Sequence, residues 1–157
     1  MIQPSQFKTA SLIVKLGNAV TYYRNLKMEN IDLTSIQSDA IIATLRNPGI
    51  TATQLKEHLQ LSQSTVAGII ARLQNKGFIA KSADSDDGRK ANLTLTQQGM
   101  LLEEPLKEIA LETQQFLVEG MSEAEQKEFT RLLEIALQNM NRMRVHKERR
   151  NLLGGNK

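Results

Sequence analysis

Residues 61–96 read LSQSTVAGIIARLQNKGFIAKSADSDDGRKANLTLT, and the first half of this stretch has the pattern of a helix. Ser62 is a residue type that accepts backbone N–H groups at a helix start. Four apolar side chains then follow at the i, i+3, i+4, i+7 spacing of one buried face: Val66, Ile69, Ile70 and Leu73. The pattern predicts an amphipathic helix that Asn-Lys-Gly at 75–77 brings to an end.

The second half of the stretch has the pattern of a hairpin. Residues 78–80 (FIA) and 91–95 (ANLTL) are expected to form two strands. The segment between them, SADSDDGRK, is too polar to be core. We therefore expect a helix that leads into two strands with a charged tip.

The face of this helix that is not apolar has a distinct chemistry. Its side chains form hydrogen bonds, are small or carry positive charge: Gln63, Ser64, Thr65, Gly68 and Arg72. Glutamine can make a paired contact with adenine, and hydroxyl groups can bond base edges or phosphates. Glycine costs up to about 1 kcal/mol inside a helix, so its presence indicates close approach by DNA or by another helix. Such a face suits the major groove of DNA.

These residues carry a resemblance to a known family. The run SQSTVAGIIARLQNKGFI at 62–79, followed by DGRKANLTLTQQG at 87–99, is similar to the recognition helix and wing of MarR-type winged helix-turn-helix regulators. The similarity extends over roughly residues 31–143. It implies a mainly α fold with a small two- or three-stranded β wing, and long N- and C-terminal helices that dimerise.

The resemblance also implies roles for the wing residues. Arg89 is expected to enter the minor groove, where narrow A·T-rich segments concentrate negative potential. Asp87 is expected to stabilise the wing by orienting Arg89 or another arginine through a charged hydrogen bond. Lys81 and Lys90 are candidate phosphate contacts, or simply solvated lysines. Arg72 has the same alternatives, and it could also pair with a carboxylate of the wing.

Composition excludes several other classes. The 157 residues contain no cysteine, which excludes a disulfide framework and a thiol-based redox switch. The two histidines lie far apart, and we expect no metal and no cofactor. No pairing of a nucleophile with a base and no glycine-rich phosphate loop is evident, so we expect no enzyme activity. No apolar run approaches the length of a membrane helix, and we expect a cytoplasmic protein.

Charge is segregated along the chain. The net charge of +3 arises mainly from the C-terminal tail. Residues 56–90 carry six basic and four acidic side chains, whereas residues 96–141 carry three basic and nine acidic ones. Phosphates would repel the acidic part, so the module with the motif is the one that can approach DNA.

The rest of the chain is expected to be helical. One helix is predicted from about Phe7 to Met28, one from Thr34 to Asn47, and a short one at 52–59 whose polar residues Gln54, Lys56 and His58 either touch phosphate or are solvated. Thr96 is expected to begin a long helix with a kink near Pro105. A last helix follows the capping box formed by Ser122 and Glu125.

The pattern divides the chain into four parts. Residues 1–30 form an N-terminal dimerisation helix, 31–96 the winged helix-turn-helix domain, 97–145 C-terminal dimerisation helices, and 146–157 a basic flexible tail. The apolar residues of the last helix cover more than one face, which indicates packing against a second subunit. A well-buried monomeric helix is the alternative.

The function expected from the motif and the resemblance is sequence-specific transcriptional regulation, most often repression. A homodimer would bind a pseudo-palindromic operator with half-sites about 34–36 Å apart. The resemblance implies release by a small aromatic or anionic effector, with Tyr22, Tyr23, Arg24 and Met28 as candidate pocket residues. The alternative function is a winged-helix module that binds protein instead of specific DNA.

Overall fold

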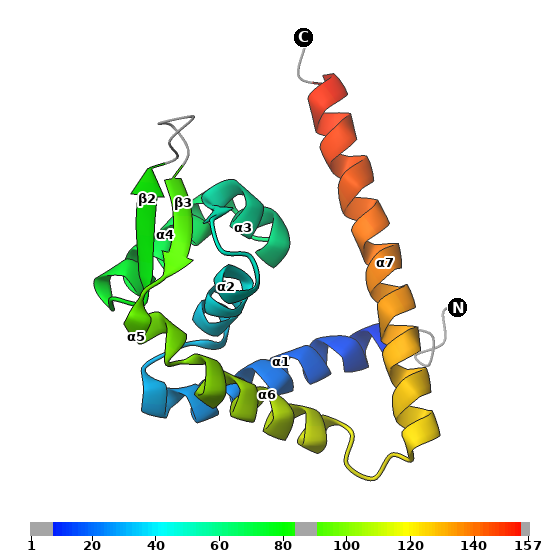
Figure 1. Cartoon of the computed structure of the whole chain (residues 1–157). Helices are drawn as coiled ribbons and strands as arrows, with labels where there is room; N and C mark the ends of the chain where they lie inside the picture. Colours follow the sequence, from blue (N-terminus) through cyan, green and yellow to red (C-terminus); the bar gives the residue numbers. More distant parts are fainter. Residues whose placement is uncertain (1–7, 84–90, 155–157) are drawn as a thin grey trace. The chain divides into compact units, whose positions relative to one another are not determined.

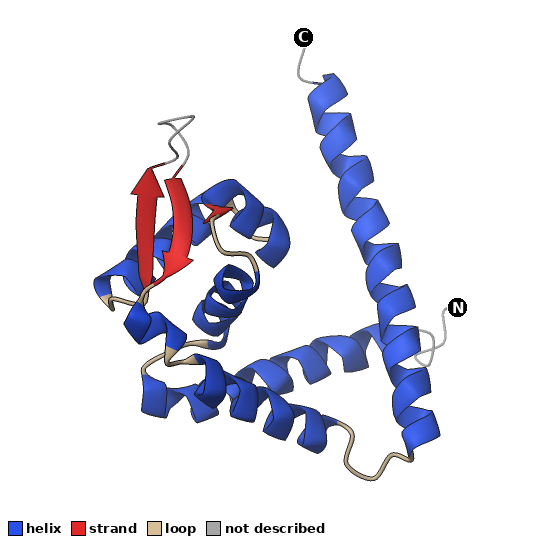
Figure 2. Cartoon of the chain, in the orientation of Figure 1, coloured by secondary structure: helices blue, strands red, loops and turns tan. Residues whose placement is uncertain are grey.

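The computed structural model describes residues 8–83 and 91–154, with residues 83 and 144–154 described by backbone alone. The chain divides into two units, Met1–Leu117 and Val118–Lys157, whose helices and strands are drawn in Figures 1 and 2. The first unit contains α1 (Lys8–Met28), the short 3-10 turn η2 (Glu29–Ile31), α2 (Ser35–Arg46), β1 (Ile50–Thr51), α3 (Ala52–Leu59), α4 (Gln63–Asn75), β2 (Ile79–Ala83), β3 (Ala91–Leu95), α5 (Gln97–Met100) and α6 (Glu103–Leu117). The second unit contains α7 (Glu123–Gly154). This arrangement confirms the predicted fold class.

The predicted helix starts are confirmed by their capping bonds. The Thr51 hydroxyl accepts the backbone N–H of Gln54 at 3.2 Å, and the Gln54 side chain accepts the N–H of Thr51 at 2.9 Å. Thr34 caps α2 in the same reciprocal way. The Ser62 hydroxyl accepts the N–H of Thr65 at 3.2 Å and so begins α4. Each cap satisfies N–H groups that have no partner inside the helix.

The sheet is antiparallel and has the order β1-β3-β2. Lys81 on β2 lies opposite Leu93 on β3, and Ile50 on β1 lies opposite Leu93 from the other side. The two predicted strands are confirmed. The third strand, β1, was not located by the sequence reasoning because it is only two residues long.

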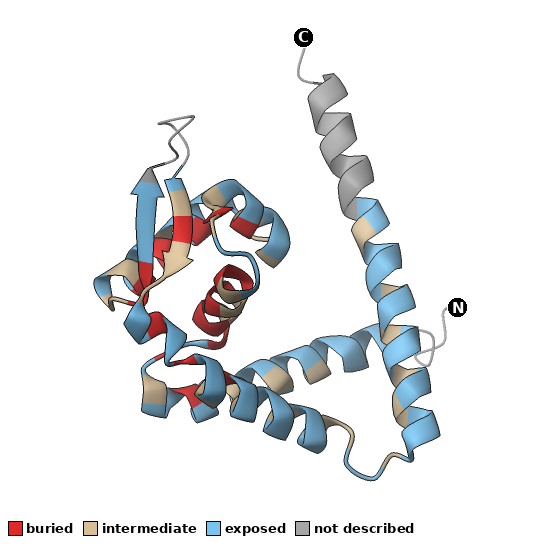
Figure 3. Ribbon diagram, in the orientation of Figure 1, coloured by how far each residue is buried: buried red, intermediate tan, exposed pale blue. Residues whose placement is uncertain are grey.

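An aliphatic core lies among α2, α3, α4 and the strands, as the buried residues in Figure 3 show. The predicted buried face of α4 is confirmed, since Val66, Ile69, Ile70 and Leu73 are all at most 2% exposed. Leu55 of α3 and Leu93 of β3 are fully buried in the same cluster. Burial of one face of α4 leaves its opposite face exposed.

The prediction of one long helix from Thr96 with a kink at Pro105 is wrong. Thr96 caps the four-residue helix α5, and a separate helix, α6, begins at Glu103. Pro105 is therefore the third residue of α6. Proline is tolerated there because N–H groups in the first turn have no acceptor within the helix.

The second unit is dominated by α7, which begins at the predicted capping box. Ser122 and Glu125 form this box through three hydrogen bonds of 2.8–3.3 Å. The helical backbone continues to Gly154 and thus includes the first residues of the predicted tail. Within the described residues, neither α7 nor any other helix is long and apolar enough to cross a membrane.

Candidate nucleic-acid interface

The pair α3–α4 forms the helix-turn-helix. Between the two helices, Gln60 adopts a left-handed conformation with φ 55°, and its N–H bonds the carbonyls of α3. Leu55 and Val66, both fully buried, belong to the core cluster on which the two helices pack. The first helix thereby supports the second in a fixed orientation, with the polar face of α4 outward.

The outward face of α4 carries the residues that the sequence predicts for DNA. Gln63, Ser64, Thr65 and Arg72 are exposed. The hydroxyls of Ser64 and Thr65 lie 3.1 and 2.7 Å from the Ser62 hydroxyl, so three hydroxyl groups gather at the start of the helix. This end of a helix also presents free N–H groups and a positive dipole, both of which favour phosphate.

Gly68 lies on the same helix and is half-buried. A Cβ atom built at this position would meet no atom within 4 Å. The sequence left open whether DNA or another helix requires a glycine here. Because no described part of this chain fills the space, helix packing inside the chain does not explain Gly68.

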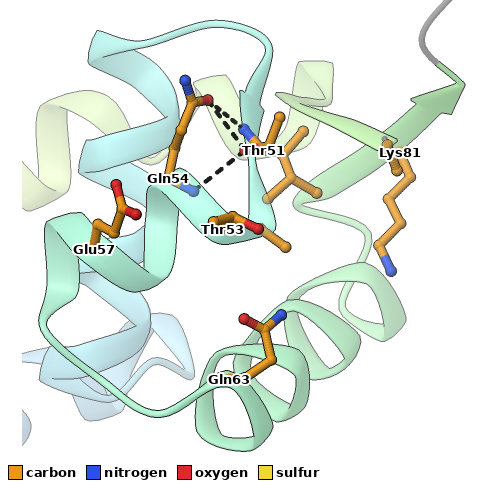
Figure 4. Close-up of a pocket in the computed structure, with 9 residues that line it drawn as sticks. Thr51, Thr53, Gln54, Glu57, Gln63 and Lys81 are labelled. Carbon is orange, nitrogen blue, oxygen red and sulfur yellow. Dashed lines mark hydrogen bonds between the residues drawn. The ribbon is translucent and has the colours of Figure 1, made fainter. Parts of the chain in front are cut away.

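The wing borders a hollow of about 550 Å³ beside α4. Figure 4 shows Gln63 of α4 and Lys81 of β2 at this hollow, with Thr53 and Glu57 of α3 also lining it. The structure therefore brings together Gln63 and Lys81, which are 18 positions apart in sequence. Asp87, Arg89 and Lys90, the other predicted wing residues, lie outside the described residues.

Sequence reasoning missed Thr53 and Glu57. It named Gln54, Lys56 and His58 on α3, of which Gln54 lines the hollow. Thr53 and Glu57 are four residues apart and therefore share one face of the helix. This i, i+4 spacing is the sequence signal that could have placed the two residues on one surface. Glu57 adds a carboxylate to a lining that also includes polar side chains, the cationic Lys81 and apolar residues such as Leu93.

The four residues grouped as a ligand pocket occupy different environments. Tyr22 is 69% exposed, whereas Met28 is 2% exposed and belongs to the core. The ring of Tyr23 packs against Phe116 of α6, with centroids 5.3 Å apart. Arg24 bonds Asp39 of α2. A shared ligand site for these four residues stays a prediction.

A second cavity was not anticipated from the sequence. It has a volume of about 470 Å³ and lies between α2 and α6. Its lining combines four apolar and three charged residues: Ile42, Leu45, Arg46, Glu103, Leu106, Lys107 and Ala110. No sequence signal joins these residues, because residues 47–102 separate the two helices along the chain.

Solved structures share this architecture. A MarR transcriptional regulator from Methanosarcina mazei Go1 matches with a TM-score of 0.80 and 27% identity, over 86% of this chain and 97% of that one. The MepR–DNA complex of S. aureus matches with a TM-score of 0.77 and 25% identity, over 86% of this chain and 98% of that one. The fold and the helix-turn-helix with its wing define a winged helix-turn-helix transcriptional regulator.

Sequence comparison relates part of this chain to a known family. Residues 31–90 match the model of the MarR family. The HTH-type transcriptional repressor IacR of Pseudomonas putida is 23% identical over 121 residues, which cover 76% of this chain and 72% of IacR. Residues 31–90 therefore resemble the MarR family, and the relatives of this chain are regulators of transcription rather than enzymes.

Proposed function

We propose that two copies of this chain form a homodimer that binds a pseudo-palindromic operator and represses transcription. The observation that carries the proposal is the exposed face of α4, on which Gln63, Ser64 and Arg72 point away from the core beside the wing. A regulator of this kind acts on DNA in the cytoplasm. Repression is supported by the similarity to IacR, which is named as a repressor.

Dimerisation is supported by apolar side chains that the single chain leaves uncovered. On α1 and α6 these include Leu12, Val14, Leu111 and Phe116, and on α7 Leu132, Ile135, Leu137, Met140 and Met143. Exposed apolar residues at this density on long helices mark protein contacts. A second copy would cover them, and the two-fold axis would present two α4 helices about 34–36 Å apart.

The proposed binding mode assigns one task to each part of the module. α4 enters the major groove, with Gln63 reading a base edge and Arg72 on phosphate. Lys81 and Lys90 contact phosphates from the wing. Arg89 enters the minor groove, and Asp87 orients it, as the family resemblance implies.

The proposal is tested by fluorescence anisotropy on the DNA upstream of the chain's own gene, across a salt series and against a random duplex. Wild type should prefer the upstream DNA, and its affinity should fall steeply with salt because bound phosphates release counterions. Arg89→Ala should lose on the order of 1–3 kcal/mol of binding free energy. Lys127→Ala, which removes one exposed charge from α7, is the matched control and should change affinity little.

Equal affinity for both duplexes would contradict specific recognition of that DNA. A selection of bound fragments from the whole genome then distinguishes an operator elsewhere from a protein-binding module. No enriched fragment, together with weak salt dependence, would favour the protein-binding alternative.

We also propose that a small aromatic or anionic effector binds in the cavity between α2 and α6. Its volume of about 470 Å³ lies in the usual range of small-molecule sites, and Arg46 and Lys107 in its lining supply two positive charges against the one carboxylate of Glu103. The test is thermal stabilisation by a panel of phenolic acids. Stabilisation should disappear in the double variant Arg46→Ala, Lys107→Ala, and failure of every panel member to stabilise wild type would contradict the proposal.

A further inference from the structure

The last turns of α1 are attached to α2 by a charged clamp. The Arg24 guanidinium contacts both carboxylate oxygens of Asp39, with Nη2 2.5 Å from Oδ1 and Nη1 3.4 Å from Oδ2. Nη2 also lies 2.9 Å from the Ser38 hydroxyl and 3.4 Å from the Ser35 carbonyl oxygen. Arginine holds a carboxylate by two parallel bonds, which restrict its orientation as well as its distance.

A second side chain of α1 reaches the same end of α2. Ser35 is the first residue of α2, and the Asn25 side-chain oxygen accepts its backbone N–H at 2.7 Å. The Ser38 hydroxyl is fully buried and donates to the Ser35 carbonyl at 2.7 Å. Neighbouring residues of α1 thus bond the first turn of α2 from one side.

The attachment continues to the recognition helix. α2 packs against both α3 and α4. At the C-terminal end of α4, Lys76 donates to the carbonyl oxygen of Asp32 and lies 3.0 Å from its carboxylate. Asp32 is in the turn between α1 and α2. The connection between α1 and α2 is therefore bonded at two places. Asp32 is bonded to Lys76 at the end of α4, and Ser35 is bonded to Asn25 of α1.

The same α1 segment also contacts α6, through the Tyr23–Phe116 ring pair and an exposed ion pair. Lys27 pairs with Glu112 at 2.8 Å, but both side chains are more than two-fifths exposed. Arg24 and Asp39 are less exposed, at 24% and 37%. Exposed ion pairs contribute little, so of these two pairs the less exposed one, Arg24–Asp39, is the stronger, and it joins α1 to α2 beside the buried Met28.

We propose that Arg24 and Asp39 are a positioning pair for DNA binding, which sets the direction of α4 relative to α1 and hence the half-site spacing that two copies bind. The inference rests on the proposed function, because α1 is part of the surface assigned to dimerisation. A pivot at the α1–α2 joint would swing the whole module, since α2, α3 and α4 share one core. With the clamp released, the dimer would accept several spacings instead of one.

The test measures affinity on operators whose half-sites are moved apart or together by one and two base pairs. The parent operator is the tightest one selected by wild type from random DNA. Wild type should lose about tenfold for each displaced spacing, whereas Arg24→Ala and Asp39→Asn should bind the whole series within about threefold. Arg24→Lys keeps the charge but not the paired bonds, and it should show the same loss of preference more weakly.

The two main variants separate positioning from charge. Arg24→Ala removes a positive charge and Asp39→Asn removes a negative one, so a purely electrostatic role would change affinity in opposite directions. A positioning role instead weakens the preference for one half-site spacing in both variants. Arg131→Ala is the matched control, because it removes an arginine whose carboxylate partner, Glu128, lies on the same helix.

A distance measurement provides a readout that does not depend on DNA. Because the sequence has no cysteine, Ala71→Cys places a single spin label on the exposed face of α4. The label-to-label distance distribution in the dimer should broaden in Arg24→Ala and stay narrow in Arg131→Ala. Circular dichroism and sedimentation establish that each variant remains folded and dimeric, and Asp39→Asn replaces Arg24→Ala if the latter does not fold.

Two outcomes overturn the inference in distinguishable ways. If wild type selects no DNA, the proposed function fails and the positioning role fails with it. If wild type has a sharp spacing preference and folded, dimeric Arg24→Ala and Asp39→Asn keep it, only the positioning role is overturned.

Discussion

A Cβ atom on Gly99 would lie 2.1 Å from the carbonyl oxygen of Phe78. The two residues are joined by close packing of α5 against the start of β2. The Thr96 hydroxyl contributes to the same contact, since it donates to the Gly77 carbonyl at 2.5 Å and accepts the N–H of Gly99 at 3.0 Å. The LT-x-x-G segment therefore attaches the end of the wing to the end of the recognition helix.

Gly99→Ala should destabilise the protein strongly. The added methyl group meets a backbone oxygen rather than a flexible side chain, so α5 or β2 must shift. We expect a loss of about 3 kcal/mol in unfolding free energy, at the upper end of overpacking costs. Urea unfolding followed by circular dichroism measures it, and a loss below about 0.5 kcal/mol, the scale of ordinary surface substitutions, would show that the contact is not close in solution.

Gly68→Ala should have the opposite effect on stability. A Cβ there meets nothing, and alanine is favoured over glycine inside a helix by up to about 1 kcal/mol. If DNA approaches this face as proposed, the same variant should bind the operator about tenfold more weakly, equivalent to ~1.4 kcal/mol. Unfolding and anisotropy measured on one preparation test both parts, and unchanged affinity would remove Gly68 from the DNA contact.

Thr96→Ala should cost about 1–3 kcal/mol of unfolding free energy. It removes the cap of α5 and leaves the Gly77 carbonyl without its hydroxyl partner. Thr96→Ser keeps the hydroxyl and is the matched control. Equal stability of Thr96→Ala and Thr96→Ser in urea would argue against a structural role for the hydroxyl.

The capping box of α7 predicts a pH dependence. Hydrogen bonds from the backbone N–H and hydroxyl of Ser122 lower the pKa of Glu125 from its ordinary 4.5. A carboxyl whose pKa is lower in the folded state stabilises the fold above the unfolded pKa, and this contribution is lost as pH falls through the folded pKa.

Wild type should therefore melt at a higher temperature than Glu125→Gln at neutral pH, and the difference should shrink as the pH falls below 4.5 and through the lowered pKa of the folded state. Other carboxylates also titrate in this range, and the glutamine variant cancels their contribution because it retains them. A difference in melting temperature that does not change with pH would show that the charge of Glu125 does not stabilise the start of α7.

The sequence predicted the local features of the fold and of the candidate site. The caps at Thr51 and Ser62 join residues three apart, and the buried stripe of α4 follows from helical periodicity, so neighbours in the sequence contain the whole signal. Pro105 misled the prediction because proline both kinks a helix and occupies its first turn. The break between α5 and α6 shows that Pro105 lies in the first turn of a new helix and not at a kink.

Other features depend on residues that the chain brings together from a distance. The guanidinium of Arg24, a residue that the sequence grouped with Tyr22 as a candidate ligand contact, bonds Asp39, 15 residues away. The hollow between Gln63 and Lys81 and the contact of Gly99 with Phe78 are of the same kind. Local hydrogen bonds and periodicity determined which helices form and which face of α4 is polar. Tertiary packing alone decided which distant side chains meet, because their partners are set by the shape of the shared core.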